Sequence, residues 1–265
     1  MKKQNKKNKL KKLIFIILII LFIGSLGYIG YYLYNNHKAS KEQNLIGKIE
    51  IDENKEIVEE NIAEKKPEEK KAENILKLEE LQKENSEIVA YLQIDGTKIS
   101  YPVLQAKDND YYVTHNYKKE YSELGSIFLD KDSSLSKPTT NFLIYGHRSK
   151  NGYMFEDLVN YKKEDFYKKH PIIKFTTNEE ESEYEIIAVF LSRIYYKSEK
   201  NVFRYYFFIN AENEKEFNDY VSNSKKAALY DTGKTAKYGD QLLTLSTCEY
   251  SQEDGRLAIV AKKVK

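Results

Sequence analysis

Residues 13–34 contain no charged side chain, and this run restricts the possible folds of the chain more than any other feature. As a helix rising ~1.5 Å per residue, the run is long enough to cross the roughly 30 Å hydrocarbon core of a bilayer. Seven lysines in residues 1–12 precede it, so the positive-inside rule places the N-terminus in the cytoplasm. We therefore expect a basic cytoplasmic tail (1–12), one membrane-spanning helix (13–34) and the rest of the chain outside the cell membrane.

A cleaved signal peptide is the alternative interpretation of this run. Signal peptides have a shorter apolar core, which ends in small residues at the cleavage site. Here the run ends in the bulky sequence YIGYYLYNNH, and its tyrosines are typical of a membrane–water interface. The sequence therefore favours an anchor that is not removed.

Beyond the anchor, a charged segment precedes the part of the chain that can fold. Residues 35–74 contain no Phe, Tyr or Trp and one proline, so we interpret them as a solvated stalk. Most of the 23 Tyr and 12 Phe lie in residues 75–265, which we expect to form the folded domain. Without the lysines of the tail, the chain has 36 basic and 41 acidic residues, a balance that argues against a nucleic-acid partner.

The pattern within 75–265 is that of a mainly β domain introduced by helices. Apolar residues at 75, 78, 81, 88 and 92 have mostly helical spacing, which predicts one or two helices ending before Asp95-Gly96. Short helices are also expected at 154–160, 164–169 and 212–224. Seven segments rich in Ile, Val, Tyr, Phe and Thr predict strands, at 98–103, 126–130, 141–145, 172–176, 184–190, 241–247 and 257–264. Seven or eight short strands with few helices favour a closed or nearly closed β-barrel.

The chain's one cysteine, Cys248, directly follows the apolar strand predicted at 241–247. A charged turn and Arg256 come next, and then a second apolar strand. If the two strands pair as neighbours, Cys248 and Arg256 meet at one rim of the barrel. Taken alone, a free cysteine at a strand end is more often a small buried apolar residue than a catalytic group.

The histidines strengthen a catalytic interpretation of Cys248. Of the four, His37 lies in the stalk, His115 in a tyrosine-rich loop and His170 before a proline, whereas His147 directly follows the predicted strand NFLIYG. A Cys–His pair generates a nucleophilic thiolate, and an arginine stabilises charge that develops on a carbonyl oxygen. Spacing in the sequence does not establish that the three residues meet. One cysteine and four scattered histidines match no metal-binding spacing, so we expect no metal site and no cofactor.

These residues resemble those of the sortases, the membrane-anchored cysteine transpeptidases of Gram-positive bacteria. The resemblance rests on T-L-S-T-C at 244–248 with Arg256 eight positions on, on YGH at 145–147, and on the anchor before them. It covers roughly residues 76–265 and is strongest to class B, through the segments NSEIVAYLQIDGTKISYPVLQ, YYVTHNY, GSIFLD and YGHRSKNGYMF. It implies a closed eight-stranded barrel with N-terminal helices and a long helix between the sixth and seventh strands, which residues 210–230 suit.

The resemblance also implies a reaction and its partners. Cys248 would attack the carbonyl after the Thr of a C-terminal sorting signal in a surface or pilin protein. An amine of a lipid II-type cell-wall precursor, or a pilin lysine, would then resolve the thioacyl-enzyme. His147 would transfer the protons and Arg256 would bind the oxyanion or the substrate backbone. Ser246 and Thr247 would line the substrate groove, and the backbone N–H of Glu249 would add an oxyanion donor.

Several alternatives remain at this stage. L,D-transpeptidases place His and Cys two residues apart, whereas here they lie 101 apart, and papain-like proteases place Cys before His. A membrane-tethered binding domain without catalytic activity would keep Cys248 as a structural residue. Among sortases, attachment of proteins to the wall and polymerisation of pilins are both open, and the sorting motif (LPxTG-like or NPxTN-like) is not readable from this chain.

Overall fold

The computed structural model describes residues 2–47, 67–149 and 152–265, which form two separate units. The first unit is the helix α1 (Lys2–Gly47), in which residues Lys11–Tyr34 have a mean hydropathy of 2.7. In the described part of the chain, this is the one helix long and apolar enough to cross a membrane. The helix continues past the apolar run into the predicted stalk (35–74), whose residues 48–66 lie outside the described residues.

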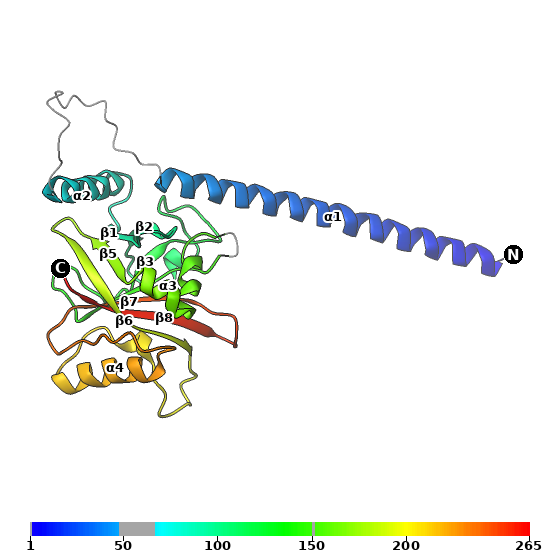
Figure 1. The fold of residues 1–265 in the computed structure, drawn as a ribbon. Coiled ribbons are helices and arrows are strands. Elements are labelled where there is room, and N and C mark those ends of the chain that lie inside the picture. Colours follow the sequence, from blue (N-terminus) through cyan, green and yellow to red (C-terminus); the bar gives the residue numbers. More distant parts are fainter. Residues whose placement is uncertain (1, 48–66, 150–151) are drawn as a thin grey trace, which may run out of the picture. The chain divides into compact units, whose positions relative to one another are not determined.

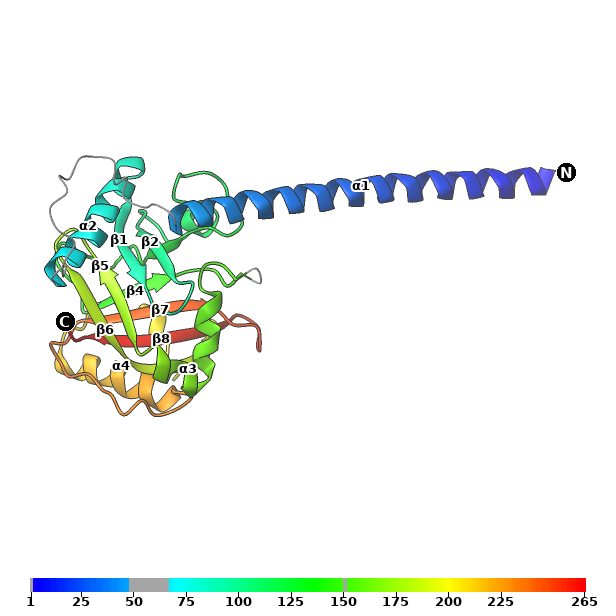
Figure 2. The same cartoon turned by 45° about the horizontal axis from the view of Figure 1, so that its top comes forward.

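The second unit contains a closed barrel of eight strands, as predicted (Figures 1 and 2). Around the barrel the order is β1-β2-β3-β4-β7-β8-β6-β5, and β5 closes the ring by pairing with β1. The β2–β3 and β4–β7 pairs are parallel, and the other pairs are antiparallel. The strands are β1 (Ile88–Gln93), β2 (Ser100–Leu104), β3 (Ile127–Leu129), β4 (Asn141–Tyr145), β5 (Ile172–Thr176), β6 (Glu181–Arg193), β7 (Leu242–Cys248) and β8 (Gly255–Lys263).

Helices pack on the outside of this barrel. The helix α2 (Pro67–Glu84) precedes β1, and the helix α4 (Glu214–Ala227) lies between β6 and β7 in the chain and packs against β6 (Figure 2). Asn213 caps α4, since its side chain accepts a hydrogen bond from the Glu216 backbone N–H at 3.1 Å. The other helical elements are η1 (Tyr111–Val113), η2 (Glu156–Lys162), α3 (Glu164–Lys169) and η3 (Tyr205–Phe207).

The prediction of one or two helices ending before Asp95-Gly96 is confirmed for its first part by α2 and is wrong for residues 88–93. The helix α2 ends at Glu84, and residues 88–93 form β1 instead. Two apolar residues four apart, such as Ile88 and Leu92, fit a helix and a strand equally well, because four is a multiple of the strand period of two. Likewise, the short helix expected at 154–160 is the 3₁₀ helix η2, two residues further along the chain.

Alternating side chains give the barrel wall two buried faces. On β7 and β8, residues 243, 245, 257, 259 and 261 belong to the cluster that fills the barrel interior. Residues 242, 258 and 260 belong to a second cluster, which includes Phe217 and Tyr220 of α4. The outer face of these strands is therefore covered by α4 and the segment before it, and position on β7 or β8 determines whether a side chain points inward or outward.

Candidate active site

The strands β7 and β8 bring Cys248 and Arg256 together. The two residues are directly paired in the antiparallel register, so their side chains lie on the same face of the sheet. That face is the outer one, since Cys248 alternates in step with Leu242 and Arg256 in step with Val260. Gly255 allows the tight approach of the two strands here, because an added Cβ would meet the Glu249 carbonyl oxygen at 2.2 Å.

His147 reaches the same place from β4, which runs parallel to β7. Tyr145 pairs with Ser246, and the Gly146 N–H donates to the Ser246 carbonyl at 3.2 Å. Gly146 has no room for a side chain, because an added Cβ would lie 2.3 Å from Cδ1 of Ile127. The chain therefore leaves β4 beside β7, which brings the imidazole of His147 close enough to the Cys248 thiol for each group to shift the pKa of the other.

A backbone carbonyl orients the imidazole. Nε2 of His147 lies 2.8 Å from the Val113 carbonyl oxygen, in η1. A carbonyl oxygen only accepts hydrogen bonds, so Nε2 carries a proton and donates it to Val113. Nδ1 is thereby left for the contact with Cys248, as the proton donor when the thiol is ionised and as the acceptor when it is not.

The pair favours ionisation of the thiol. The hydrogen bond with His147 lowers the pKa of Cys248, burial opposes this, and the positive charge of Arg256 lowers it further. In the same way, the hydrogen bond with Cys248 raises the pKa of His147, against the effect of burial. A thiolate next to an imidazolium is a nucleophile and a general acid side by side.

All four arginines of the chain lie at this end of the barrel, whereas its 39 lysines are spread along the sequence. Arg256 pairs with Cys248, and Arg193 ends β6 opposite Gly255. Arg148 follows His147, and its guanidinium carbon lies 4.9 Å from the ring centroid of Tyr250. Arg204 donates to the backbone carbonyls of residues 196 and 199, at 2.7 and 2.8 Å. Two of these charges are balanced, because Arg148 is ion-paired with Glu156 and Arg193 with Glu199, and Arg256 is the guanidinium that directly faces Cys248.

The expected groove residues Ser246 and Thr247 are buried instead. Thr247 points to the other side of the sheet from Cys248, and its hydroxyl donates to the Gly146 carbonyl at 2.8 Å. Ser246 shares the face of Cys248, but its Oγ lies 2.7 Å from the Tyr205 hydroxyl, and Ser246 is 2% exposed. Both hydroxyls therefore support the strand behind Cys248. Because successive residues of a strand point to opposite faces, the sequence alone already places Ser246 on the face of Cys248 and Thr247 on the other face.

The structure also gives Glu249 other partners than a substrate oxyanion. Its backbone N–H donates to the Gly255 carbonyl at 2.9 Å, as the ladder between β7 and β8 continues one residue past Cys248. Its carboxylate accepts hydrogen bonds from Lys162 Nζ at 2.8 Å and from the backbone N–H of Ser251 at 2.8 Å. The expected oxyanion donor is thus engaged within the protein.

The remaining histidines with described contacts lie elsewhere. His115 stacks on Tyr111 with ring centroids 4.1 Å apart, and Nδ1 of His170 lies 2.8 Å from the Asp95 carbonyl oxygen. Sequence reasoning missed Val113, whose contribution is a backbone carbonyl and has no signature in the sequence. It also missed Tyr205, whose hydroxyl is paired with Ser246. In the described part of the chain, no group of three or more His, Cys, Asp or Glu residues is placed to hold a metal ion.

A closed eight-stranded barrel that presents a paired Cys and His beside an Arg has the architecture of a cysteine transpeptidase. The Sortase domain family model matches residues 92–264, and the chain belongs to the sortase family. Within that family it is most similar to class B. It is 38% identical to sortase B of Listeria monocytogenes and 31% identical to sortase B of Staphylococcus aureus. Each match extends over 189 residues, 71% of this chain and 74% of the relative.

The solved structures agree. A Staphylococcus aureus sortase B–substrate complex matches with a TM-score of 0.64 and 30% identity, over 72% of this chain and 85% of that one. Sortase B of Listeria monocytogenes matches with a TM-score of 0.60 and 37% identity, over 70% and 99% of the two chains. Sortase B from B. anthracis in complex with AAEK1 matches with a TM-score of 0.66 and 31% identity, over 88% and 98%. The chain is a cysteine transpeptidase of the sortase B type.

Proposed function

We propose that this sortase cleaves a C-terminal sorting signal after Thr, through Cys248, His147 and Arg256. The observation that carries the proposal is that β4, β7 and β8 bring His147, Cys248 and Arg256 to one rim of the barrel, with Arg256 directly opposite the cysteine. The thiolate, the proton donor and the oxyanion partner of an acyl transfer are then present on neighbouring strands.

The reaction follows from these positions. The Cys248 thiolate attacks the Thr carbonyl carbon, and the carbonyl oxygen becomes an oxyanion. The C–N bond then breaks, the leaving amine takes the Nδ1 proton of His147, and a thioester to Cys248 remains. An incoming amine gives a proton back to His147 and attacks the thioester, which forms the new amide and releases the thiolate.

Arg256 is the proposed oxyanion and backbone-binding group, because the nearby N–H of Glu249 donates to Gly255. Its guanidinium offers a planar set of donors that a lysine ammonium does not. Nη1 of Arg256 already donates to the Gly255 carbonyl at 2.9 Å, which holds the guanidinium at the rim. We assign Ser246, Thr247 and Glu249 to the support of this site rather than to contact with the substrate.

We propose as partners a surface protein bearing a sorting motif and an amine of a cell-wall precursor. In support, one structure of Staphylococcus aureus sortase B is described as a substrate complex, and a second sortase B structure as a complex with triglycine. Polymerisation of pilins through a lysine is the second candidate for the acceptor step. The helix α1 would anchor the enzyme by residues 13–34 with the tail 1–12 in the cytoplasm and the domain 75–265 outside.

The test is cleavage of a panel of sorting-motif peptides by the full chain in detergent micelles, followed by mass spectrometry with and without amine acceptors. Cleavage after Thr by the wild-type protein and none by Cys248→Ala supports the proposal and identifies the motif. Equal products from both proteins would refute it. If no peptide is cut and Cys248 also resists alkylation at neutral pH, the chain is a tethered binding domain with a structural cysteine.

A further inference from the structure

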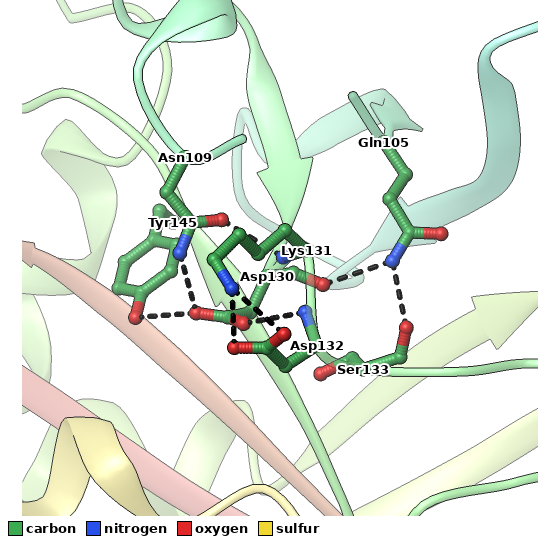
Figure 3. Close-up of polar contacts among 7 residues, drawn as sticks. All are labelled: Gln105, Asn109, Asp130, Lys131, Asp132, Ser133 and Tyr145. Atoms are coloured by element: carbon green, nitrogen blue, oxygen red, sulfur yellow. Dashed lines mark hydrogen bonds and ion pairs between the residues drawn. The ribbon is translucent and has the colours of Figure 1, made fainter. Parts of the chain in front are cut away.

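Asp130, the residue after β3, carries a buried carboxylate that the proposed reaction does not use. The residue is 4% exposed, and its carboxylate accepts three hydrogen bonds (Figure 3). Oδ2 accepts from Nδ2 of Asn109 at 2.9 Å and from the Tyr145 hydroxyl at 3.0 Å, and Oδ1 accepts from the backbone N–H of Asp132 at 2.9 Å. All three donors are neutral groups. A buried carboxylate is costly unless such bonds satisfy it, so the position of each partner is tightly constrained.

Further hydrogen bonds fix the backbone around this carboxylate. Nε2 of Gln105 donates to the carbonyl oxygens of Asp130 at 2.9 Å and Ser133 at 2.7 Å. The amide oxygen of Asn109 accepts from the backbone N–H of Lys131 at 2.8 Å, so Asn109 binds both the side chain and the backbone of this turn. Figure 3 shows the partners converging on Asp130 from three segments of the chain. The turn after β3 is therefore a rigid junction.

Two of the joined segments carry the groups that orient the imidazole of His147. Tyr145 is the last residue of β4 and stands two residues before His147. Asn109 stands four residues before Val113, whose carbonyl binds Nε2 of His147. The distance between this carbonyl and the end of β4 determines whether His147 bonds to Val113 and Cys248 at once, and Asp130 spans that distance.

We propose that Asp130 is a positioning residue, which holds the segments of Tyr145 and Val113 in the register that aims His147 at Cys248. The inference rests on the proposed function for its effect on turnover, but its geometric content concerns the Cys248–His147 pair alone. Asp130 acts on the pair indirectly, through Tyr145 and Asn109, which both donate to its carboxylate.

Tyr145 suits this role as a permanent donor. Burial and the neighbouring charge of Asp130 raise the pKa of its phenol, so the hydroxyl keeps its proton over the working pH range. It lies on the same side of the wall as the active site, packing with Phe128 at a ring-centroid distance of 5.3 Å. Because its hydroxyl is bonded to Asp130, Tyr145→Phe removes one hydrogen bond and leaves the ring packing in place.

The test compares Tyr145→Phe and Asp130→Asn with the wild-type chain in two assays. In peptide cleavage, we expect kcat to fall about ten-fold or more with KM nearly unchanged, because the geometry of the pair is lost and the substrate contacts are kept. In Cys248 alkylation against pH, we expect the midpoint to rise by about half a unit or more, because a misdirected His147 stabilises the thiolate less. The double variant should lose no more kcat than the stronger single variant, since both substitutions break the same Tyr145–Asp130 hydrogen bond.

The control is Tyr91→Phe on β1, which removes a phenol hydroxyl that lies 2.9 Å from Oγ of Ser100 on β2. It should leave both assays unchanged. An unchanged alkylation midpoint in Tyr145→Phe and Asp130→Asn, whatever their turnover, would overturn the positioning role and leave Asp130 a structural carboxylate. The alkylation assay needs no sorting peptide, so a failure of the proposed reaction is recognised separately as absence of Cys248-dependent cleavage by the wild-type chain.

Discussion

The Val113 carbonyl oxygen lies 2.8 Å from Nε2 of His147 and fixes which nitrogen of the ring faces Cys248. An imidazole held at one nitrogen by a carbonyl has a defined tautomer and a defined direction for its other nitrogen. In many catalytic triads a carboxylate side chain performs this task, and here a main-chain group does. His147 held in this way and the positive charge of Arg256 both lower the pKa of the Cys248 thiol.

This pairing predicts the pH dependence of Cys248. The hydrogen bond with His147 and the charge of Arg256 lower the pKa of the thiol, so its alkylation rate should reach half-maximum below the ordinary value of about 8.5. Removal of the imidazole in His147→Ala should move the midpoint upward. Iodoacetamide labelling followed by mass spectrometry over pH 5–10 measures both. A midpoint that His147→Ala leaves in place would contradict the pairing.

Turnover should depend on pH on both sides of an optimum. It should rise with pH as Cys248 ionises through its lowered pKa, and fall as His147 loses its proton through its raised pKa. His147→Ala lacks the group that protonates the leaving amine, so it should retain very little turnover at any pH. The profile of kcat/KM for the cleaved peptide is the measurement, and a rate that is flat across the neutral range in the wild-type protein would count against the assignment.

Replacement of Arg256 by Lys separates charge from geometry. Arg256→Lys keeps a positive charge opposite Cys248 but loses the fixed fork of donors. We expect kcat/KM to fall by roughly 10²-fold, as when one oxyanion donor is removed, and the alkylation midpoint of Cys248 to move less than in His147→Ala. Equal kcat/KM in wild type and Arg256→Lys would show that charge alone suffices. Lys262→Arg, at the opposite end of the same strand, is the matched control and should leave both unchanged.

Thr247 is expected to support activity indirectly, by stabilising the backbone next to His147, so its loss should lower both stability and activity. Its hydroxyl donates to the Gly146 carbonyl at 2.8 Å inside the barrel, next to His147. Thr247→Val keeps the shape but leaves a buried carbonyl without its donor, which should lower the free energy of unfolding by about 1–3 kcal/mol. Thr247→Ser retains the hydroxyl and should recover most of the lost activity. Urea unfolding and peptide cleavage test this, and a Thr247→Val variant with wild-type stability would exclude the hydrogen bond as a support.

The sequence was sufficient to predict the barrel and to nominate Cys248, His147 and Arg256, which the structure brings to one rim. Strand ends are recognisable in a sequence because apolar runs stop at Gly, Asp or charged residues, and the ends of neighbouring strands meet at one edge. Side-chain direction near those ends was predicted less well. Ser246 and Thr247 were grouped together although successive residues of a strand point to opposite faces.

Two features of the site had no sequence signal strong enough to predict them. The contribution of Val113 is made by its carbonyl, which every residue possesses, so its identity says nothing about the contact. Asp130 stands before a turn, where an aspartate is ordinary, and only the folded chain shows that its carboxylate is buried between Asn109 and Tyr145. Contacts between segments that are distant in sequence depend on the strand order of the barrel, which spacing alone does not determine.

The ion pair between Lys162 and Glu249 should stabilise the fold in a way that depends on pH. Burial alone would raise the pKa of Glu249, but the bonds from Lys162 and Ser251 outweigh it and lower the pKa to about 2. A carboxyl whose folded pKa is lowered contributes stability that is fully present above its unfolded pKa of about 4.3 and is lost as pH falls through the folded value. The contribution of Glu249 should therefore fade between about pH 4.3 and 2.

Lys162→Met tests this pair, because it leaves the carboxylate of Glu249, a residue 4% exposed, without its cation. The variant should have a lower free energy of unfolding than the wild type at pH 7. Its free energy of unfolding should also decrease less than that of the wild type when the pH falls from 5 to 3. Lys168→Met is the matched control, since Lys168 and its partner Glu164 are both well exposed and such a pair contributes little to stability. Adding Glu249→Gln to Lys162→Met removes the unpaired charge and should restore part of the loss at pH 7. Chemical denaturation from pH 7 to 3 measures all four proteins, and Lys162→Met behaving like Lys168→Met would show that Lys162 does not hold Glu249.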